Sequence, residues 1–245
     1  MARTRARLTA VAAATLLTLS VSACGSGGDS GSGGGKKSAK DSGFAAEPGG
    51  VIVKAALKDM GTVKTMRVTG HMTIDGGPVT FDFSTDAAGT CGGTMGLGRG
   101  QATIVATKTA GFLKGDDAFW KEQAGKSAAQ VQQMLAGRWA KTPPTGQITA
   151  LCDIGHGLID QVSGEDMVAA KAGKVSTLDG TPVVTVTSGS GKEKYEIVVE
   201  LASPHHLRKL VSLTPGDEGE IAFSDFGRTK AIHVPAGSEF VDLKK

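Results

Sequence analysis

The side chains best suited to chemistry are three cysteines, Cys24, Cys91 and Cys152, and five histidines. A cysteine metal site needs cysteine or histidine partners at short, regular spacing. The histidines show no such spacing with Cys91 or Cys152 and stand at positions 71, 156, 205, 206 and 233. The sequence therefore predicts no metal site and no cofactor, and the odd number of cysteines needs another explanation.

Cys24 follows a segment with the features of an export signal. Residues 1–7 are basic, and the apolar stretch from Leu8 to Val21 covers about fourteen residues, too few to span a bilayer comfortably. Residues 1–23 are therefore interpreted as a secretory signal peptide. The segment has no Arg-Arg pair, which favours general secretion over the twin-arginine route.

The residues around the expected cleavage site, Val21-Ser22-Ala23-Cys24, resemble the lipobox of bacterial lipoproteins. The resemblance implies that Cys24 carries a diacylglycerol, with palmitate-like acyl chains, and becomes the mature N-terminus. Each buried methylene contributes about 0.8 kcal/mol, so a diacyl anchor holds a protein stably at a membrane. The alternative is ordinary signal cleavage beside a chance cysteine. The interpretation of these residues as a lipobox predicts a protein anchored by lipid on the extracytoplasmic face of the cell membrane.

The formal net charge of +3 comes from the signal segment. Arg3, Arg5 and Arg7 lie there, and their removal leaves 24 basic residues against 24 acidic residues. A neutral remainder with 4% aromatic residues does not favour a nucleic-acid partner.

Residues 24–50 are predicted to be a flexible tether after the lipidated cysteine. They are mostly Gly, Ser, Lys and Asp, a composition that cannot bury enough surface to fold. A Gly-rich chain of about 25 residues reaches about 25–30 Å. The folded domain is therefore expected at 51–245.

With Cys24 assigned to the anchor, Cys91 and Cys152 remain in an oxidising compartment. Pairing is the natural interpretation there. The bridge would close a loop of about 60 residues and contribute about 4 kcal/mol. The alternative is two free buried thiols.

The expected folded domain contains no complete catalytic motif. Gly125-Lys126-Ser127 ends like a phosphate-binding loop, but the required first glycine is replaced by Trp120. His205 and His206 are adjacent, so in a strand they point to opposite faces and are expected to be a solvated pair. Asp116-Asp117 is expected to be a turn. Without a hydrolase signature the chain is not predicted to be an enzyme.

Hydrophobic periodicity predicts the elements of the fold. Residues 51–60 have helical spacing and are followed by Gly61. Residues 66–75 and 79–84 alternate with a period of two around Gly76-Gly77-Pro78, which predicts an antiparallel hairpin with one apolar face. Further strands are expected at 90–97, 101–108 and 112–115, and helical segments at 127–136, 147–160 and 163–171.

The C-terminal part returns to strands, expected at 173–179, 182–188, 193–202, 206–214, 218–226 and 230–234. Strands followed by helices and again by strands do not form a doubly wound fold. The order predicts an α+β fold with one curved antiparallel sheet and helices on one side.

This layout resembles the actinobacterial LppX/LprG-type lipoproteins, which are related in fold to the LolA/LolB carriers. The resemblance covers about 51–240 and includes the lipobox, the tether, the helix ending AALKDMGTVKTMRVTG and the interruption at GRWAKTPP. It implies a half-open β-barrel with helices over its concave face and an apolar cavity between them. Family members bind acylated lipids and help to move lipids or lipoproteins through the envelope.

The residues expected to line such a cavity are the apolar members of the alternating strands. They are Val68, Met72, Phe81, Phe83, Tyr195, Ile197, Val199, Leu201, Ile221 and Phe223. Alternation alone does not distinguish a cavity from a packed core. The expected function is therefore binding or carriage of acylated lipid by an anchored lipoprotein. The alternative is an interaction or structural lipoprotein with a solid core and an envelope protein as its partner.

Overall fold

The helix predicted at 51–60 is present as α2 (Gly49–Met60), which ends directly before Gly61. The computed structural model describes residues 43–74, 76–143, 170–228 and 230–243. One side of α2 is apolar and buried, through Ile52, Val53, Ala56 and Met60. At the start of α2, a Cβ on Gly49 would lie 2.5 Å from the Ala170 carbonyl oxygen, so this helix begins in close contact with the chain that enters the second half of the sheet.

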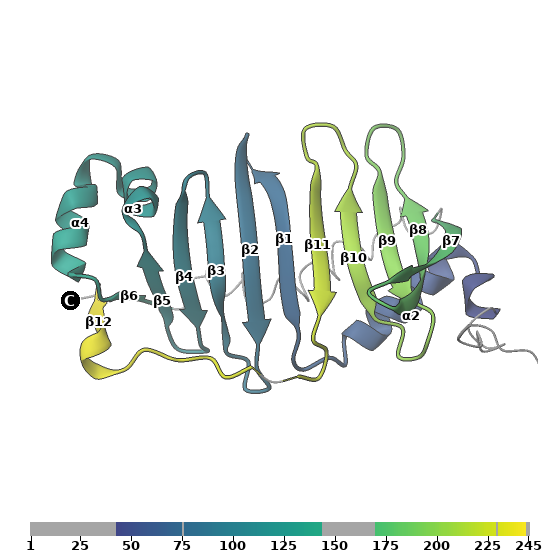
Figure 1. Ribbon diagram of the computed structural model, residues 1–245, viewed down its shortest axis with the longest axis horizontal. Helices are drawn as coiled ribbons and strands as arrows, with labels where there is room; N and C mark the ends of the chain where they lie inside the picture. The colour runs from purple at the N-terminus through teal and green to yellow at the C-terminus, as the bar shows by residue number, and fades with distance from the viewer. Residues whose placement is uncertain (1–42, 75, 144–169, 229, 244–245) are drawn as a thin grey trace, which may run out of the picture. The chain divides into compact units, whose positions relative to one another are not determined.

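Twelve strands form one sheet, which is not closed into a barrel (Figure 1). The first six strands are β1 (Arg67–Ile74), β2 (Gly77–Thr85), β3 (Cys91–Leu97), β4 (Gly100–Ala106), β5 (Gly111–Gly115) and β6 (Trp139–Thr142). The other six are β7 (Lys171–Leu178), β8 (Thr181–Ser188), β9 (Tyr195–Glu200), β10 (Leu207–Ser212), β11 (Gly219–Ser224) and β12 (Phe240–Asp242).

The strand order is β12-β6-β5-β4-β3-β2-β1-β11-β10-β9-β8-β7. Two antiparallel meanders, β1–β6 and β7–β11, therefore meet where β1 pairs with β11. Only β12 pairs in parallel among the described strands, and its partner is β6. The predicted α+β fold with a curved antiparallel sheet and helices is confirmed.

Several local predictions differ from the structure. The predicted tether ends too late, since Phe44 and Ala45 pack against the main core and α2 begins at Gly49. Residues 230–234 lack strand structure where described, because Ile232 packs on the sheet without joining its ladder. Strands β6 and β12 were missed, since elements of four and three residues show no readable periodicity. Asp116-Asp117 is not a turn: Asp116 begins a missed helix, α3 (Asp117–Ala124). The helix expected at 163–171 does not reach Lys171, the first residue of β7. The segment 147–160 and residues 163–169 lie outside the described residues.

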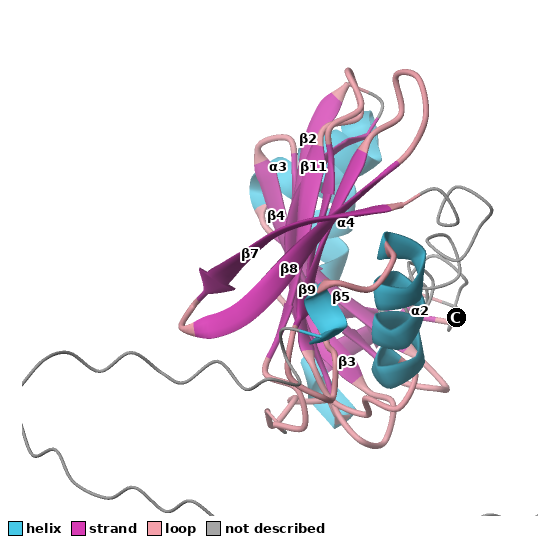
Figure 2. Ribbon diagram, turned by 90° about the vertical axis from the view of Figure 1, so that its right-hand side faces the viewer, coloured by secondary structure: helices cyan, strands magenta, loops and turns pink. Residues whose placement is uncertain are grey.

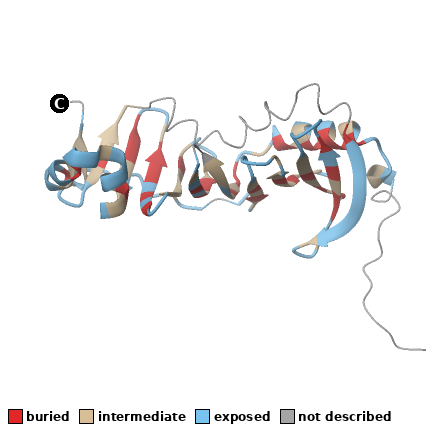
Figure 3. Cartoon of the chain, turned by 90° about the horizontal axis from the view of Figure 1, so that it is seen from above, coloured by how far each residue is buried: buried red, intermediate tan, exposed pale blue. Residues whose placement is uncertain are grey.

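The sheet has an apolar inner face, defined as the face against which α2 packs, beside β8 and β9 (Figure 2). The main core lies on this face and extends from β4 to β8. A smaller core on the opposite, outer face joins Val105 and Phe112 to Ile232 and Phe240. Buried residues follow the sheet along its length, whereas β7 at the right-hand edge is exposed (Figure 3).

Two more helices, α3 and α4 (Ala128–Leu135), follow β5. The Asp116 side chain accepts a hydrogen bond of 2.7 Å from the Phe119 backbone nitrogen, which caps α3. A Cβ on Gly115 would lie 2.3 Å from the Phe119 ring, and this glycine therefore lets α3 contact the inner face. No helix among the described residues is long and apolar enough to cross a membrane.

Candidate functional site

The ten residues predicted to line a cavity all lie in the main core or against it. Eight are buried, with exposures of 7% or less, and Met72 and Tyr195 are partly buried. The prediction that these alternating residues share one apolar face therefore matches their placement. Whether that face encloses a lipid cavity is a separate matter and stays a prediction.

Strand register aligns these residues in rows across the inner face. Val68 lies opposite Phe83 on one side and opposite Phe223 on the other. In the next row, Gly70 separates Phe81 from Ile221. A Cβ on Gly70 would lie 2.5 Å from the Phe81 ring, so the ring occupies the space that a side chain would take. The rows form an apolar strip across strands that are distant in sequence.

Helix α2 covers the strip mainly over the second meander. Its buried side packs toward β7, β8, β9 and β10, where Ile197 and Val199 are fully buried. Surface grooves in the described part of the chain occur instead near the ends of the strands.

One groove, called here the lysine pocket, has a volume of about 340 Å³ and lies at the turn between β8 and β9, at the top of Figure 1. Of the ten predicted lining residues, Tyr195 alone borders it. It is lined by Lys171, Thr187, Ser188, Gly189, Lys194, Tyr195 and Leu213. The two lysines were missed in the sequence, since no motif relates them. The only hint was a lysine directly before the alternating run of β9.

A second groove, of about 480 Å³, lies at the opposite end of the strands. It is lined by Thr62, Val63, Lys64, Thr65, Ala87, His206, Phe226 and Gly227. Val63 and Phe226 also pack against the main core. This groove therefore reaches the apolar face from the lower end.

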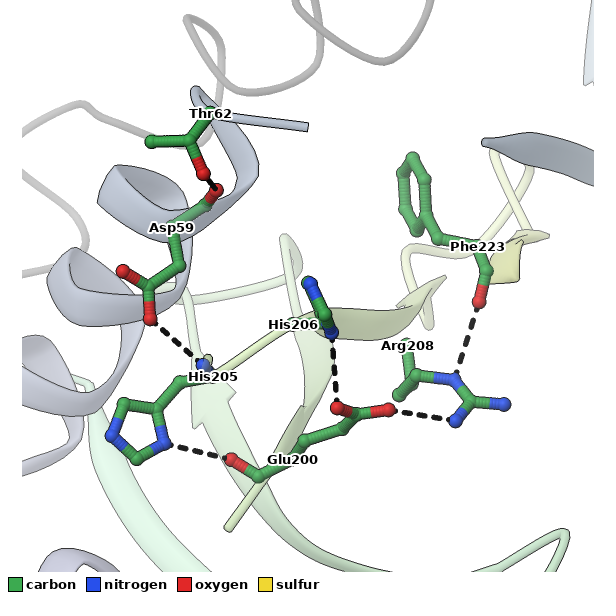
Figure 4. Close-up of polar contacts among 7 residues, drawn as sticks. All are labelled: Asp59, Thr62, Glu200, His205, His206, Arg208 and Phe223. Carbon is green, nitrogen blue, oxygen red and sulfur yellow. Dashed lines mark hydrogen bonds and ion pairs between the residues drawn. The ribbon is translucent and has the colours of Figure 1, made fainter. Parts of the chain in front are cut away.

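One residue of the lower groove, His206, belongs to a group of interlocked polar residues, called here the glutamate cluster (Figure 4). The cluster consists of Asp59, Glu200, His205, His206 and Arg208. The Glu200 carboxylate accepts hydrogen bonds from Arg208 Nη1 at 2.8 Å and from His206 Nδ1 at 3.1 Å. Its side chain is 15% exposed and that of Arg208 is 14% exposed. Two donors thus share one nearly buried carboxylate.

The histidine pair at 205 and 206 is not the solvated pair that was expected. The His205 ring stacks on Phe44 with 3.6 Å between centroids, and the His206 ring stacks on Phe226 at 4.1 Å. The His205 backbone nitrogen donates to Asp59 Oδ2 at 2.8 Å. Both rings are partly buried because they have aromatic partners and join separate hydrogen bonds.

The acidic pair at 116 and 117 has structural contacts. Besides the cap by Asp116, Asp117 Oδ1 accepts a hydrogen bond of 2.8 Å from Gln132 Nε2, which joins α3 to α4. Gly125–Ser127 forms a short 3₁₀ helix between the two helices. Within the described ranges, no three histidine, cysteine, aspartate or glutamate side chains are placed to hold a metal ion.

On the outer face, the Arg67 guanidinium forms two hydrogen bonds with the Asp82 carboxylate. Arg67 Nε donates to Oδ1 at 2.8 Å and Nη2 donates to Oδ2 at 2.6 Å. This bond lowers the pKa of the Asp82 carboxyl and raises the pKa of the Arg67 guanidinium. The two side chains are 43% and 42% exposed, so solvent screens the interaction.

Of the three cysteines, only Cys91 lies among the described residues. It is fully buried at the start of β3, in the main core. Cys24 and Cys152 lie outside the described residues, so the lipid anchor and the Cys91–Cys152 bridge stay predictions.

Among solved structures, the chain is similar to LprF from Mycobacterium bovis, with a TM-score of 0.55 and 14% identity over 78% of this chain and 100% of that chain. It is also similar to the Mycobacterium tuberculosis lipoprotein LppX, with a TM-score of 0.48 and 10% identity over 79% of this chain and 100% of that chain. No family model and no curated protein matches the sequence. The resemblance to the LppX/LprG-type fold is confirmed. At these identities the likeness concerns the fold alone.

Proposed function

We propose that this chain is an envelope lipoprotein, anchored through Cys24, whose domain binds the acyl chains of a lipid or an acylated protein. One observation carries the proposal: the apolar strip of the inner face continues across both meanders, while the main contacts of α2 are with β7–β10. The likeness in fold to LprF supports the proposal.

The free energy of binding would come from removing acyl methylenes from water. Each buried methylene contributes about 0.8 kcal/mol, so a chain of ordinary length gains several kcal/mol even after its ordering cost. In this proposal the grooves at the two strand ends are the entrances, since both reach residues that pack against the main core.

A second function is favoured by the burial of the same residues. Ile197 and Val199 are 0% exposed and Phe223 is 1% exposed, as expected where side chains pack on one another. In that case the domain is a solid scaffold, and its partner is an envelope protein that contacts its surface.

Mass spectrometry of the purified protein tests the first function against the second. Every described helix and strand begins after residue 42, so a chain without residues 1–24 keeps all of them. We expect organic extraction of this chain to release a lipid in about stoichiometric amount. If the chain is consistently lipid-free and does not take up a fluorescent fatty acid, the lipid-binding function is wrong and the scaffold function is supported.

A pair of variants shows whether the inner face holds the lipid. Met72→Glu places a charge on the inner face at a partly buried position, and Thr80→Glu places the same charge on the exposed outer face. We expect lipid loss only from Met72→Glu, with equal urea midpoints showing that both variants fold.

The lipid anchor is tested separately. Cys24→Ala in the full chain is expected to abolish incorporation of labelled palmitate.

A further inference from the structure

The lysine pocket combines features of an anion-binding site with contact to the apolar face. Its position is fixed by hydrogen bonds between neighbouring strands. The Lys194 backbone nitrogen donates to Thr214 Oγ1 at 3.2 Å, and the Leu213 nitrogen donates to the Lys194 carbonyl oxygen at 2.8 Å. The start of β9 is thereby tied to the end of β10, which holds Lys194 at the rim of the pocket.

Two positive charges border this pocket, and none of its lining residues among the described ones is acidic. Lys171 lies opposite Thr187, and Thr187 lies opposite Glu196, so these three side chains share the outer face at the end of the sheet. Tyr195 is on the inner face, so the pocket lies at the sheet end, where the two faces meet. Neither Lys171 nor Lys194 forms an ion pair with a residue in the described part of the chain, although Lys141, Lys209, Arg67 and Arg208 do. Two lysine charges are therefore available to an external anion.

The floor of the pocket leads to the inner face. Tyr195 lines the pocket and also packs against the main core. In the ladder it lies opposite Ser188 on one side and Ser212 on the other, in a row of hydroxyl-bearing residues at the margin of the apolar strip. Leu213 adds an apolar side chain that is 46% exposed. One side of the pocket is thus cationic and polar, and the other is continuous with apolar surface.

We propose that the lysine pocket binds a phosphate group, and that this phosphate is the head of a lipid whose acyl chains lie against the inner face. This step rests on the proposed function. Lysine ammonium groups bind phosphate as point charges, and tyrosine, serine and threonine hydroxyls can donate to its oxygens. The volume of about 340 Å³ suits a small head group, since ligand pockets begin at about 300 Å³.

Three probes separate the lipid from the free anion: short-chain phosphatidylglycerol, diacylglycerol with the same acyl chains, and inorganic phosphate. Binding is measured by calorimetry on the chain without residues 1–24, with each lipid below its micelle concentration. We expect phosphatidylglycerol to bind about tenfold more tightly than diacylglycerol, and this preference to shrink as salt is added.

The variant Lys171→Gln/Lys194→Gln should remove this preference and leave diacylglycerol binding unchanged. Its control is Lys121→Gln/Lys126→Gln, which loses the same charge at two exposed positions in the α3 region and should bind like the parent chain. Equal binding of phosphatidylglycerol by the lysine-pocket variant and the parent would overturn the proposal.

The probes also distinguish failure of this site from failure of the proposed function. If both lipids bind equally and phosphate does not bind, the head-group site is wrong and the lipid-binding function stands. If phosphate binds at the lysine pocket and neither lipid binds, the anion site stands and its assignment to a lipid is wrong. In that case the proposed function falls as well.

Discussion

The two ends of the β8–β10 strands carry opposite arrangements of charge. At the lower end, Glu200 is shared by Arg208 and His206, and Asp59 holds the backbone of His205 (Figure 4). At the upper end, Lys171 and Lys194 border a groove without ion pairs to described residues. Charges that satisfy one another stabilise the fold, whereas charges without such partners can serve a ligand. The difference predicts that the lower end is important for stability and the upper end for binding.

The largest expected effect concerns the predicted Cys91–Cys152 bridge. Cys91 begins β3, at the lower end of the sheet in Figure 1. Replacing Cys152 with Ser should lower the free energy of unfolding by about 4 kcal/mol, since the open loop of about 60 residues gains entropy when the chain unfolds. Urea denaturation measures this change. Reduction of the parent chain should give the same loss, and an unchanged urea midpoint in both cases would show that no bridge forms.

The next effect comes from Glu200 itself. Glu200→Gln removes the nearest carboxylate from Arg208, which is 14% exposed, and weakens the bond to His206. The other carboxylate near Arg208, that of Asp179, is 3.7 Å away and 80% exposed. A nearly buried charge that loses its partner destabilises a protein by about 3 kcal/mol. The same urea experiment should show this loss.

A matched control is Glu220→Gln. Glu220 accepts from Lys209 at 2.8 Å, but the two side chains are 35% and 26% exposed. The expected loss is about 1 kcal/mol or less. Equal losses in the two variants would contradict the distinction between the interlocked glutamate cluster and an ordinary surface pair.

A smaller effect is expected for Asp82, whose pair with Arg67 is close in geometry but open to solvent. Because the pKa of this carboxyl is lowered in the folded chain, its stabilisation is present above the ordinary aspartate pKa, near 3.8, and disappears as the pH falls through the folded value. Asp82→Asn should therefore lower stability by less than about 1 kcal/mol at neutral pH. Urea midpoints measured from pH 7 to pH 3 should converge with those of the parent. A difference that persists at pH 3 would assign the effect to lost packing.

Alternation in the sequence was sufficient to predict the sheet where one face is apolar. The hairpin of β1 and β2 and the strand β9 were read correctly because buried residues recur with a period of two. The same alternation placed the ten apolar residues on one face. It did not reveal α3, although the aspartate at 116 is a recognisable helix cap.

The lysine pocket and the glutamate cluster could not be read from the sequence in the same way. Lys171 begins β7 and Lys194 directly precedes β9, so the two residues are brought to one pocket only through the pairing of β7 with β8 and of β8 with β9. Likewise, the partners of Glu200 are set by the register of β9 and β10 and by the position of α2. Such groupings depend on tertiary contacts, which local periodicity does not encode.

The smallest effect on stability is expected at the upper end. Lys171→Gln/Lys194→Gln removes no ion pair with a described residue, and both side chains are exposed. The free energy of unfolding should therefore change by less than about 0.5 kcal/mol in the absence of ligand. Urea denaturation with and without short-chain phosphatidylglycerol measures the consequence. The parent chain should be stabilised by the lipid, because a ligand that binds the folded state raises the free energy of unfolding, and the variant should gain less. A large loss of stability without ligand would instead mean that these lysines hold the strand ends together, and the contrast between the two ends would disappear.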